Sequence, residues 1–206
     1  MKRAAWRKGG PFWHTPPMDS LESRMIRLLA DIHPLDRIPR AGYVLRGVPE
    51  PESVAAHSHF VALLTLLVCD ACPGQFDRDK ALTMAIMHDL AEARLMDIPM
   101  PVGDAYLKDA KRDAEQAIFD DLLAGFPARY AEYHRELLDA ASPEARLIRG
   151  LDKAQMMIKI VMYQKEGRGR LDEFWNNPRN FADFGIEPVA RLFDAICAHA
   201  GKTRPG

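Results

Sequence analysis

Histidine and carboxylate side chains stand at positions that should face a helical core. His88 and Asp89 are neighbours within the apolar run 84–94, and Glu92 follows His88 by one helical turn. An uncompensated buried charge costs several kcal/mol, so these groups need a partner of opposite charge. A divalent cation would meet that need.

Two other segments carry side chains of the same kind. His57 falls in line with Val54 and Val61 on one predicted helix, and Asp152 shares the apolar stripe of another with Ile148. Two imidazoles and two carboxylates from three helices would form a mixed nitrogen and oxygen set, which suits manganese, cobalt, iron, nickel, zinc or magnesium. Each residue alone could be a hydrogen-bonded core residue, but together they favour a metal site. We predict one divalent ion, because the remaining histidines form no second cluster. The predicted ligands are His57, His88, Asp89 and Asp152.

Apolar periodicity predicts that helices position these groups. The predicted helices cover residues 19–32, 52–71, 78–96, 104–123, 128–140, 143–166 and 187–200. Asp19 is the expected N-cap of the first helix, whose apolar stripe is Leu21, Met25, Leu28 and Leu29. Proline and glycine should keep residues 34–51 in a loop, and residues 167–180 should be loosely ordered. Aromatic residues in 174–184 would form a lid or a dimer surface. The pattern predicts an all-α single domain over residues 19–206 after a flexible arm over 1–18.

Composition limits the classes of partner. The chain has 206 residues, 48% of them hydrophobic and 28% charged, as expected for one soluble domain. A net charge of -1 indicates neither a long nucleic acid nor an anionic membrane as partner, although a small anion can still bind locally. The longest apolar stretch, 60–69, is about half of the roughly 20 residues that cross a bilayer. Three cysteines favour a reducing compartment, so we expect a cytoplasmic protein.

The order of His57, the His88-Asp89 pair and Asp152 resembles the HD-domain metal-dependent phosphohydrolases over about residues 40–163. More narrowly, the chain resembles the small single-domain branch that contains bacterial 5'-deoxynucleotidases and their eukaryotic relatives. The segments that carry this resemblance are 39–44, 51–58, 88–93, 97–99 and 151–153. It implies an HD-domain helical bundle with the metal between core helices, and a homodimer.

The resemblance also implies roles for further residues. An arginine at the position of Arg40 would reach the substrate phosphate, and Arg46 lies on the same loop. The carboxylates that match Glu92 and Asp97 serve proton transfer and water orientation in the family. We assign Glu92 to proton transfer and Asp97 to positioning the water or the substrate. The expected reaction removes the 5'-phosphate from ribo- or deoxyribonucleoside monophosphates by metal-activated water.

Other functions stay open at this point. A related enzyme could hydrolyse another small phosphate ester or a pyrophosphate, although no extra basic cluster is evident beside the motif. A non-catalytic, metal-stabilised scaffold would keep the four ligands but has no need of Glu92, Asp97 and Arg40. Ala41 stands where the bacterial nucleotidases typically have tryptophan after the arginine, so the preference for deoxyribose or ribose is not determined.

Overall fold

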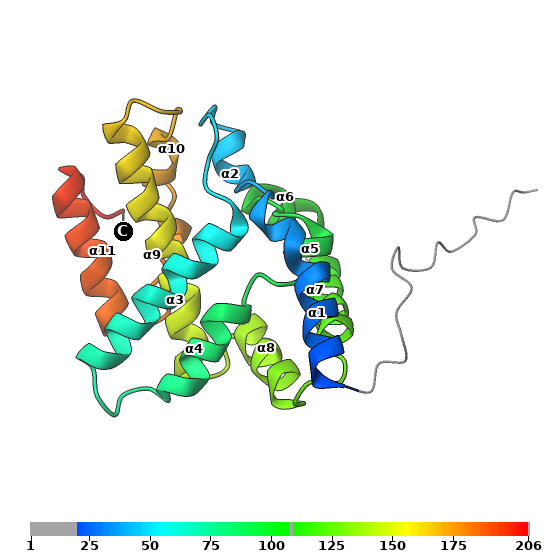
Figure 1. Ribbon diagram of the computed structural model, residues 1–206. Helices are drawn as coiled ribbons and strands as arrows, with labels where there is room; N and C mark the ends of the chain where they lie inside the picture. Colours follow the sequence, from blue (N-terminus) through cyan, green and yellow to red (C-terminus); the bar gives the residue numbers. More distant parts are fainter. Residues whose placement is uncertain (1–19, 108, 206) are drawn as a thin grey trace, which may run out of the picture.

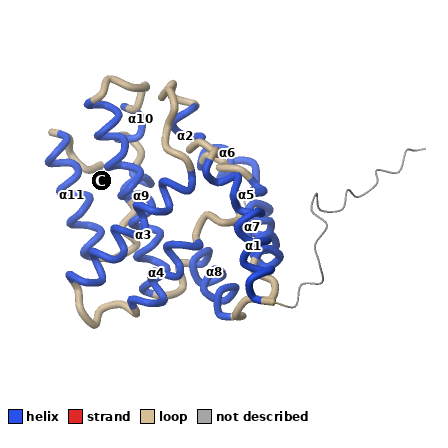
Figure 2. The backbone as a smooth tube through the Cα atoms, viewed as in Figure 1, coloured by secondary structure: helices blue, strands red, loops and turns tan. Residues whose placement is uncertain are grey.

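The computed structural model describes residues 20–107 and 109–205. The predicted arm over 1–18 lies outside the described residues. Helices and connecting loops make up the described part of the chain, and its only β-type pairing is an isolated antiparallel bridge between Pro39 and Ser53 (Figure 2). The prediction of an all-α fold is therefore confirmed.

The helices follow one another from α1 to α11, with three short non-α helical turns between them. The first half holds α1 (Leu21–Ile32), a 3-10 turn (His33–Asp36), α2 (Ala41–Val44), α3 (Val54–Ala71), α4 (Arg78–Met87), α5 (Glu92–Leu95), α6 (Met100–Val102) and a π turn (Gly103–Leu107). The second half holds α7 (Asp109–Leu122), α8 (Arg129–Asp139), α9 (Pro143–Lys165), α10 (Asp172–Trp175), a 3-10 turn (Pro178–Phe181) and α11 (Glu187–Ala200).

Helix α9 is the centre of the bundle and packs against α3, α4, α8 and α11 (Figure 1). Ser142 caps its first turn by accepting a hydrogen bond from the Ala145 N–H, and Pro143 occupies the first turn, where a missing N–H costs nothing. Gly150 lets α11 approach closely, because a Cβ there would lie 2.9 Å from a Val189 methyl carbon. A long apolar helix with neighbours on several sides thus holds the fold together.

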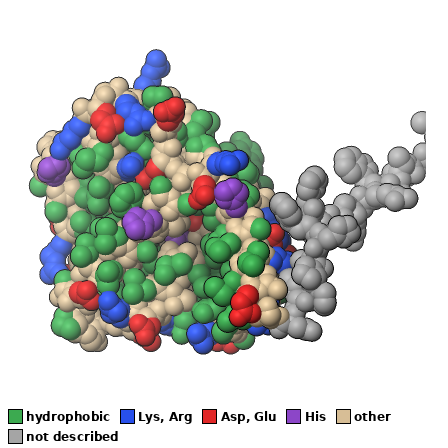
Figure 3. Space-filling model, viewed as in Figure 1, with side chains coloured by type: hydrophobic (Ala, Val, Ile, Leu, Met, Phe, Trp, Pro, Cys, Tyr) green, Lys and Arg blue, Asp and Glu red, His purple; other side chains and the backbone are tan. Residues whose placement is uncertain are grey.

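Helix α3 crosses α9 and has one buried and one exposed face. His57 and Val61 are completely buried, whereas Phe60, Leu63 and Leu67 are exposed. Figure 3 shows hydrophobic side chains gathered over α3 and α4 on the face in view. By length and composition alone the 18 residues of α3 could cross a membrane, with a mean hydropathy of 1.6. The apolar segment Val54–Ala71 is therefore longer than the stretch 60–69 identified from the sequence.

The predicted helix 78–96 is interrupted at the predicted metal ligands His88 and Asp89. Helix α4 ends at Met87, and turns with hydrogen bonds from an N–H to the carbonyl three residues back follow, such as Leu90 N–H to Met87 O and Glu92 N–H to Asp89 O. The cause is local, because the His88 Nδ1 donates to the Ala85 carbonyl, an acceptor that a continuing helix would use for its own backbone. The break turns His88 and Asp89 toward α3.

The first helix begins one residue later than predicted and buries less. Ser20 is its N-cap and accepts a hydrogen bond from the Ser23 N–H, whereas Asp19 lies outside the described residues. No residue of α1 is fully buried. Leu28 packs against the cluster around Phe119, but the other residues of the predicted stripe are exposed (Leu21, Met25 and Leu29). The apolar stripe exists, but of its four residues only Leu28 packs against the core.

Two segments contain more helix than their sequence predicted. Residues 34–51 include α2 and part of a 3-10 turn, with Pro34 in the first turn of the 3-10 segment. Residues 167–180 contain α10, where Trp175 is buried and its Nε1–H donates to Gln164 Oε1. Trp175 and Phe181 therefore belong to the core, and the prediction of a lid or dimer surface is wrong for them. The predicted helix 104–123 starts only at Asp109, after the π turn.

Candidate metal centre

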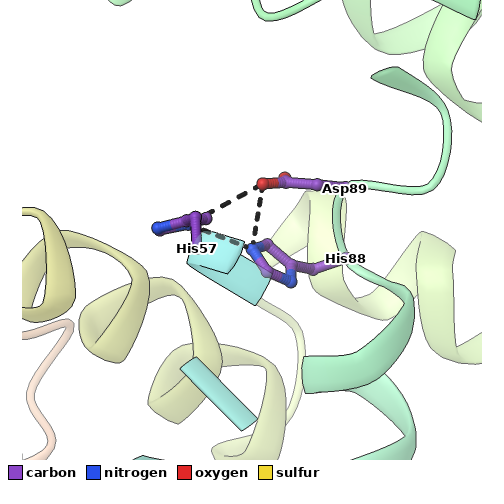
Figure 4. A group of neighbouring side chains, drawn as sticks. All are labelled: His57, His88 and Asp89. Atoms are coloured by element: carbon purple, nitrogen blue, oxygen red, sulfur yellow. Dashed lines mark hydrogen bonds and ion pairs between the residues drawn. The ribbon is translucent and has the colours of Figure 1, made fainter. Parts of the chain in front are cut away.

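Three of the predicted ligands converge at one point in the core. Figure 4 shows His57, His88 and Asp89 directed toward one another, and one potential ligand atom from each lies within 4.8 Å of the others. The His57 Nε2 is 3.4 Å from the His88 Nε2 and 3.7 Å from the Asp89 Oδ2. The His88 Nε2 is 3.1 Å from the same Asp89 oxygen. One imidazole comes from α3, and the other two groups come from the turn after α4.

Asp152 adjoins this group from α9. Its Oδ1 lies 3.0 Å from the His57 Nε2, on the side of the imidazole that faces His88 and Asp89. All four residues predicted from their spacing are thus neighbours in space. Asp152 is the most accessible of them, with a side chain that is 33% exposed. It lies at the boundary between the buried group and a cavity.

The nitrogen and oxygen atoms that meet at this point are arranged to bind a cation. Both imidazoles use Nδ1 elsewhere, in His88 on the Ala85 carbonyl and in His57 on the Gln155 amide oxygen, and so direct Nε2 into the site. The Asp89 Oδ2 is buried and accepts no hydrogen bond, although it lies near the His88 ring. Buried polar atoms without a partner are rare and need an explanation such as an ion. A divalent metal with nitrogen and oxygen ligands accounts for all of these features.

Without a cation, the ionisable groups compensate one another. Burial alone would raise the pKa of Asp89, but the neighbouring His88 lowers it to about 2. Burial alone would lower the pKa of His88, but Asp89 raises it to about 9. Asp152 also has a pKa below its ordinary value, because the hydrogen bond and charge of His57 outweigh burial. The carboxylates stabilise positive charge on the neighbouring His88 imidazole, so a metal ion that binds here would displace protons.

Arg40 lies among the carboxylates at the floor of the site. Its Nη1 is 3.6 Å from both Asp89 Oδ2 and Asp97 Oδ1, and its Nη2 is 3.7 Å from Asp152 Oδ1. Burial would lower the pKa of this guanidinium, but Asp97 and the other carboxylates raise it above its ordinary value. Arg40 is the N-cap residue of α2, and that short helix positions it. A fixed cation is therefore present beside the potential metal ligands.

Glu92 and Asp97 differ in their surroundings. Burial, together with the charges of Asp89 and Asp97, raises the pKa of Glu92 to about 10. In the metal-free protein these surroundings favour the protonated form of Glu92, and its Oε2 is buried without a hydrogen bond. Asp97 instead accepts a hydrogen bond of 2.7 Å from the Ala41 N–H through Oδ2. Its other oxygen faces Arg40.

A cavity of about 520 Å³ opens over these groups. Tyr43, Met156 and Phe174 form part of its wall, and Asn177 and Asn180 supply polar groups. Its volume lies within the roughly 300–1,000 Å³ of ordinary small-molecule sites. The cavity is therefore large enough for a small organic anion beside the metal ligands.

Arg46 lies on the cavity wall, away from the ligands. It forms an ion pair with Glu173, and its guanidinium carbon lies 5.7 Å from the centre of the Phe174 ring. The structure thus brings Arg46 to the same cavity as Arg40. Its charge is already paired with Glu173, whereas Arg40 stands beside the potential ligands.

Sequence reasoning missed four further cations in the cavity wall. They are Lys111, Arg112, Arg149 and Lys153. Lys111 pairs with Glu115, Arg112 pairs with Asp139, and Arg149 donates to the Leu138 carbonyl. The expectation that no extra basic cluster lies beside the motif is wrong, because α7 and α9 bring distant residues together. Only Lys153 could have been found from the sequence, because it directly follows Asp152.

Comparisons with known proteins bear on the family of this chain. The model of the HD domain family matches residues 32–181. The 5'-deoxynucleotidase HDDC2 of Danio rerio is 31% identical over 155 residues, which cover 73% of this chain and 76% of that protein. The 5'-deoxynucleotidase hdd1 of Schizosaccharomyces pombe is 28% identical over 145 residues, which cover 67% of this chain and 71% of that protein.

Solved structures share the fold. A conserved hypothetical protein from Pyrococcus furiosus superposes with a TM-score of 0.70 at 35% identity and covers 85% of this chain and 98% of its own. A protein from Magnetospirillum magnetotacticum described as a predicted metal-dependent phosphohydrolase has a TM-score of 0.60 at 18% identity and covers 93% of this chain and 100% of its own. At that identity the second likeness concerns the fold alone.

Proposed function

Because this chain belongs to the HD domain family, we propose that it is a metal-dependent phosphohydrolase that removes the 5'-phosphate from nucleoside monophosphates, deoxyribonucleotides above all. The observation that carries the proposal is the convergence of two Nε2 atoms and a buried, unbonded carboxylate oxygen at the floor of a cavity. The names of the relatives support the substrate class.

His57, His88, Asp89 and Asp152 would hold one divalent ion, of manganese, cobalt, iron, nickel, zinc or magnesium. When bound, such an ion polarises a phosphate oxygen and lowers the pKa of water to about 7. Arg40 would bind the phosphate, because a buried guanidinium is suited to bidentate contact with phosphate oxygens. Arg46 would bind the substrate farther up the cavity wall, with Phe174 beside it.

Glu92 is suited to donate a proton to the leaving 5'-oxygen, because burial and the neighbouring carboxylates Asp89 and Asp97 raise its pKa and favour its protonated form. Asp97 would act through Arg40, since one of its oxygens accepts from the first N–H of α2 and the other faces the guanidinium. It would thereby position the substrate phosphate. The carboxyl groups of Glu92 and Asp97 are both largely buried, which limits the access of bulk water to them.

A second candidate is hydrolysis of another phosphate ester or a pyrophosphate. The cations in the cavity wall favour it, because a more highly charged substrate would bind them. Lys111, Arg112 and Arg149 already have partners within the protein, so we rank this candidate second.

We also propose a cytoplasmic homodimer. The exposed apolar face of α3, formed by Phe60, Leu63 and Leu67, supports self-association. Three free cysteines are compatible with a reducing compartment. Light scattering of the purified protein should give the mass of a dimer, and fractionation of the source cells should recover it with soluble cytoplasmic markers. A monomeric mass at working concentrations would contradict the first proposal, and a membrane-bound fraction would contradict the second.

The test of function is phosphate release from a panel of nucleotides. Chelated protein is reloaded separately with manganese, cobalt, magnesium or zinc and given ribo- and deoxyribonucleoside 5'-monophosphates, the matching 3'-monophosphates and inorganic pyrophosphate. We expect release from 5'-monophosphates that requires added metal and is faster with deoxyribose.

The remaining outcomes distinguish the alternatives. Release from pyrophosphate alone would replace the proposal with the second candidate. Metal that binds and raises the melting temperature without any phosphate release would favour a non-catalytic, metal-stabilised scaffold.

A further inference from the structure

A chain of buried hydrogen bonds leads from His57 away from the cavity. The His57 Nδ1 is 2.6 Å from Gln155 Oε1, and Gln155 Nε2 is 3.2 and 3.1 Å from the two carboxylate oxygens of Glu52. All three residues are buried, with 0%, 4% and 9% exposure for His57, Gln155 and Glu52. Neither Glu52 nor Gln155 lines the cavity. Their side chains reach the site through the imidazole of His57.

The direction of every bond in this chain follows from Glu52. A carboxylate only accepts hydrogen bonds, so Gln155 must turn its NH₂ group toward Glu52 and its oxygen toward His57. An amide oxygen also only accepts, so His57 must carry a proton on Nδ1 and donate it. The Nε2 of the same ring then faces His88, Asp89 and Asp152. A neutral His57 held in this way presents its lone pair to the metal.

The negative end of the chain is itself supported. Lys159 Nζ lies 3.5 Å from Glu52 Oε2, so a cation stands beside the buried carboxyl group. Asp152, Gln155 and Lys159 are three and four residues apart and share one side of α9. One helix thus supplies a candidate ligand, the amide that orients a ligand from α3, and the cation that balances Glu52.

We infer that Glu52 and Gln155 are positioning residues of the metal centre, which fix the tautomer and the orientation of His57 and make its Nε2 a stronger ligand. The inference rests on the proposed metal site and deepens it. Partners behind a metal ligand typically change metal affinity by about 10–100-fold when they are removed. A purely structural hydrogen-bonded pair would contribute to folding but leave the affinity of the folded protein unchanged.

Two variants separate these roles. Gln155→Met keeps the approximate side-chain volume and removes the hydrogen bonds to both His57 and Glu52. The double variant Glu52→Gln/Gln155→Glu exchanges the two groups without changing net charge, so the new carboxylate accepts from both His57 and the new amide. The control is Gln164→Met, which removes an amide of the same helix that bonds Trp175, about 13 Å farther along α9.

The measurement is the dissociation constant for zinc and for cobalt, from competition with a chromogenic chelator, in protein whose fold is verified by circular dichroism. We expect Gln155→Met to bind about 10–100-fold more weakly than the wild type and Gln164→Met to bind like the wild type. The exchanged double variant should bind at least as tightly as the wild type. If Gln155→Met does not fold, the double variant alone decides, because it should keep every hydrogen bond.

A spectroscopic measurement reports the tautomer directly. In zinc-loaded protein with ¹⁵N-labelled histidine, the Nδ1 proton of His57 should be observed in the wild type and the double variant and lost to exchange in Gln155→Met. Unchanged affinity in Gln155→Met, or a double variant that binds as weakly as Gln155→Met, would overturn the inference. Both readouts are independent of phosphate release, so a protein without nucleotidase activity could still confirm this chain of residues.

Discussion

His134 should make the stability of this protein depend on pH. This residue of α8 is only 3% exposed, and its ring stacks on Phe119 with centroids 4.1 Å apart. Its Nδ1 lies 3.0 Å from Gln116 Oε1, and that amide donates to Asp120 through its nitrogen, so Nδ1 carries the proton. Burial lowers the pKa of His134 to about 4. The folded protein therefore holds this imidazole neutral.

The sign and size of the effect follow from linkage. An unfolded histidine has a pKa of about 6.5, so between pH 6.5 and 4 the unfolded state binds more protons than the folded state. The contribution of His134 to stability is present above that range and is lost as the pH falls. Between pH 7 and pH 5 the free energy of unfolding should fall by about 2 kcal/mol from this group, approaching about 3 kcal/mol below pH 4.

The assay compares urea unfolding of the wild type and His134→Gln at pH 7 and pH 5, followed by circular dichroism in the presence of a chelator. His88, whose pKa is raised to about 9, contributes in the opposite direction over this interval, but it is common to both proteins. The variant need not match the wild type at pH 7, because the test is the loss of stability between the two pH values. Equal losses in the two proteins would refute the reasoning.

Three substitutions at the site have separate expected outcomes. Asp152→Ala should lose metal and phosphate release together, as measured by metal analysis after gel filtration, and stoichiometric metal in this variant would remove Asp152 from the ligand set. Glu92→Gln should keep the metal and the fold but lower turnover by about 10²–10⁴-fold, and unchanged turnover would exclude Glu92 from proton transfer. Arg40→Met should destabilise the metal-free protein by about 3–5 kcal/mol, because it leaves buried carboxylates without their guanidinium. Added metal should restore part of that loss in urea unfolding, and equal effects of metal on the variant and the wild type would contradict this account.

The long helices could be predicted from the sequence because each one is specified locally. The final helix was predicted over 187–200 and is observed over Glu187–Ala200, and the predicted helix 143–166 differs from α9 by one residue. Both have apolar residues at helical spacing, and Ser142 and Pro143 mark the start of the second. The short helices of 34–51 and 167–180 were missed, because fewer than two turns give too little periodicity to detect.

The candidate ligands could also be found from the sequence, because a charge at a core position stands out against an apolar stripe. That argument supplied His57, His88, Asp89 and Asp152, which the structure brings together. It could not predict the break after Met87. There the His88 side chain donates to a backbone carbonyl, and two of the candidate ligands change direction. A period of 3.6 residues reports which face a residue occupies, and it does not report where the helix must end for that residue to reach its partners.

Tertiary structure alone decided what surrounds the ligands. Glu52 precedes α3 and Gln155 lies on α9, 103 positions later, and nothing in either segment indicates that they meet. The same holds for Lys111, which the packing of α7 brings to the cavity wall. The sequence by itself determined most of the long helices and the types of side chain on their buried faces, since both depend on neighbours along the chain. Which of those side chains orient a ligand, pair with it or line the cavity depends on how separate helices pack.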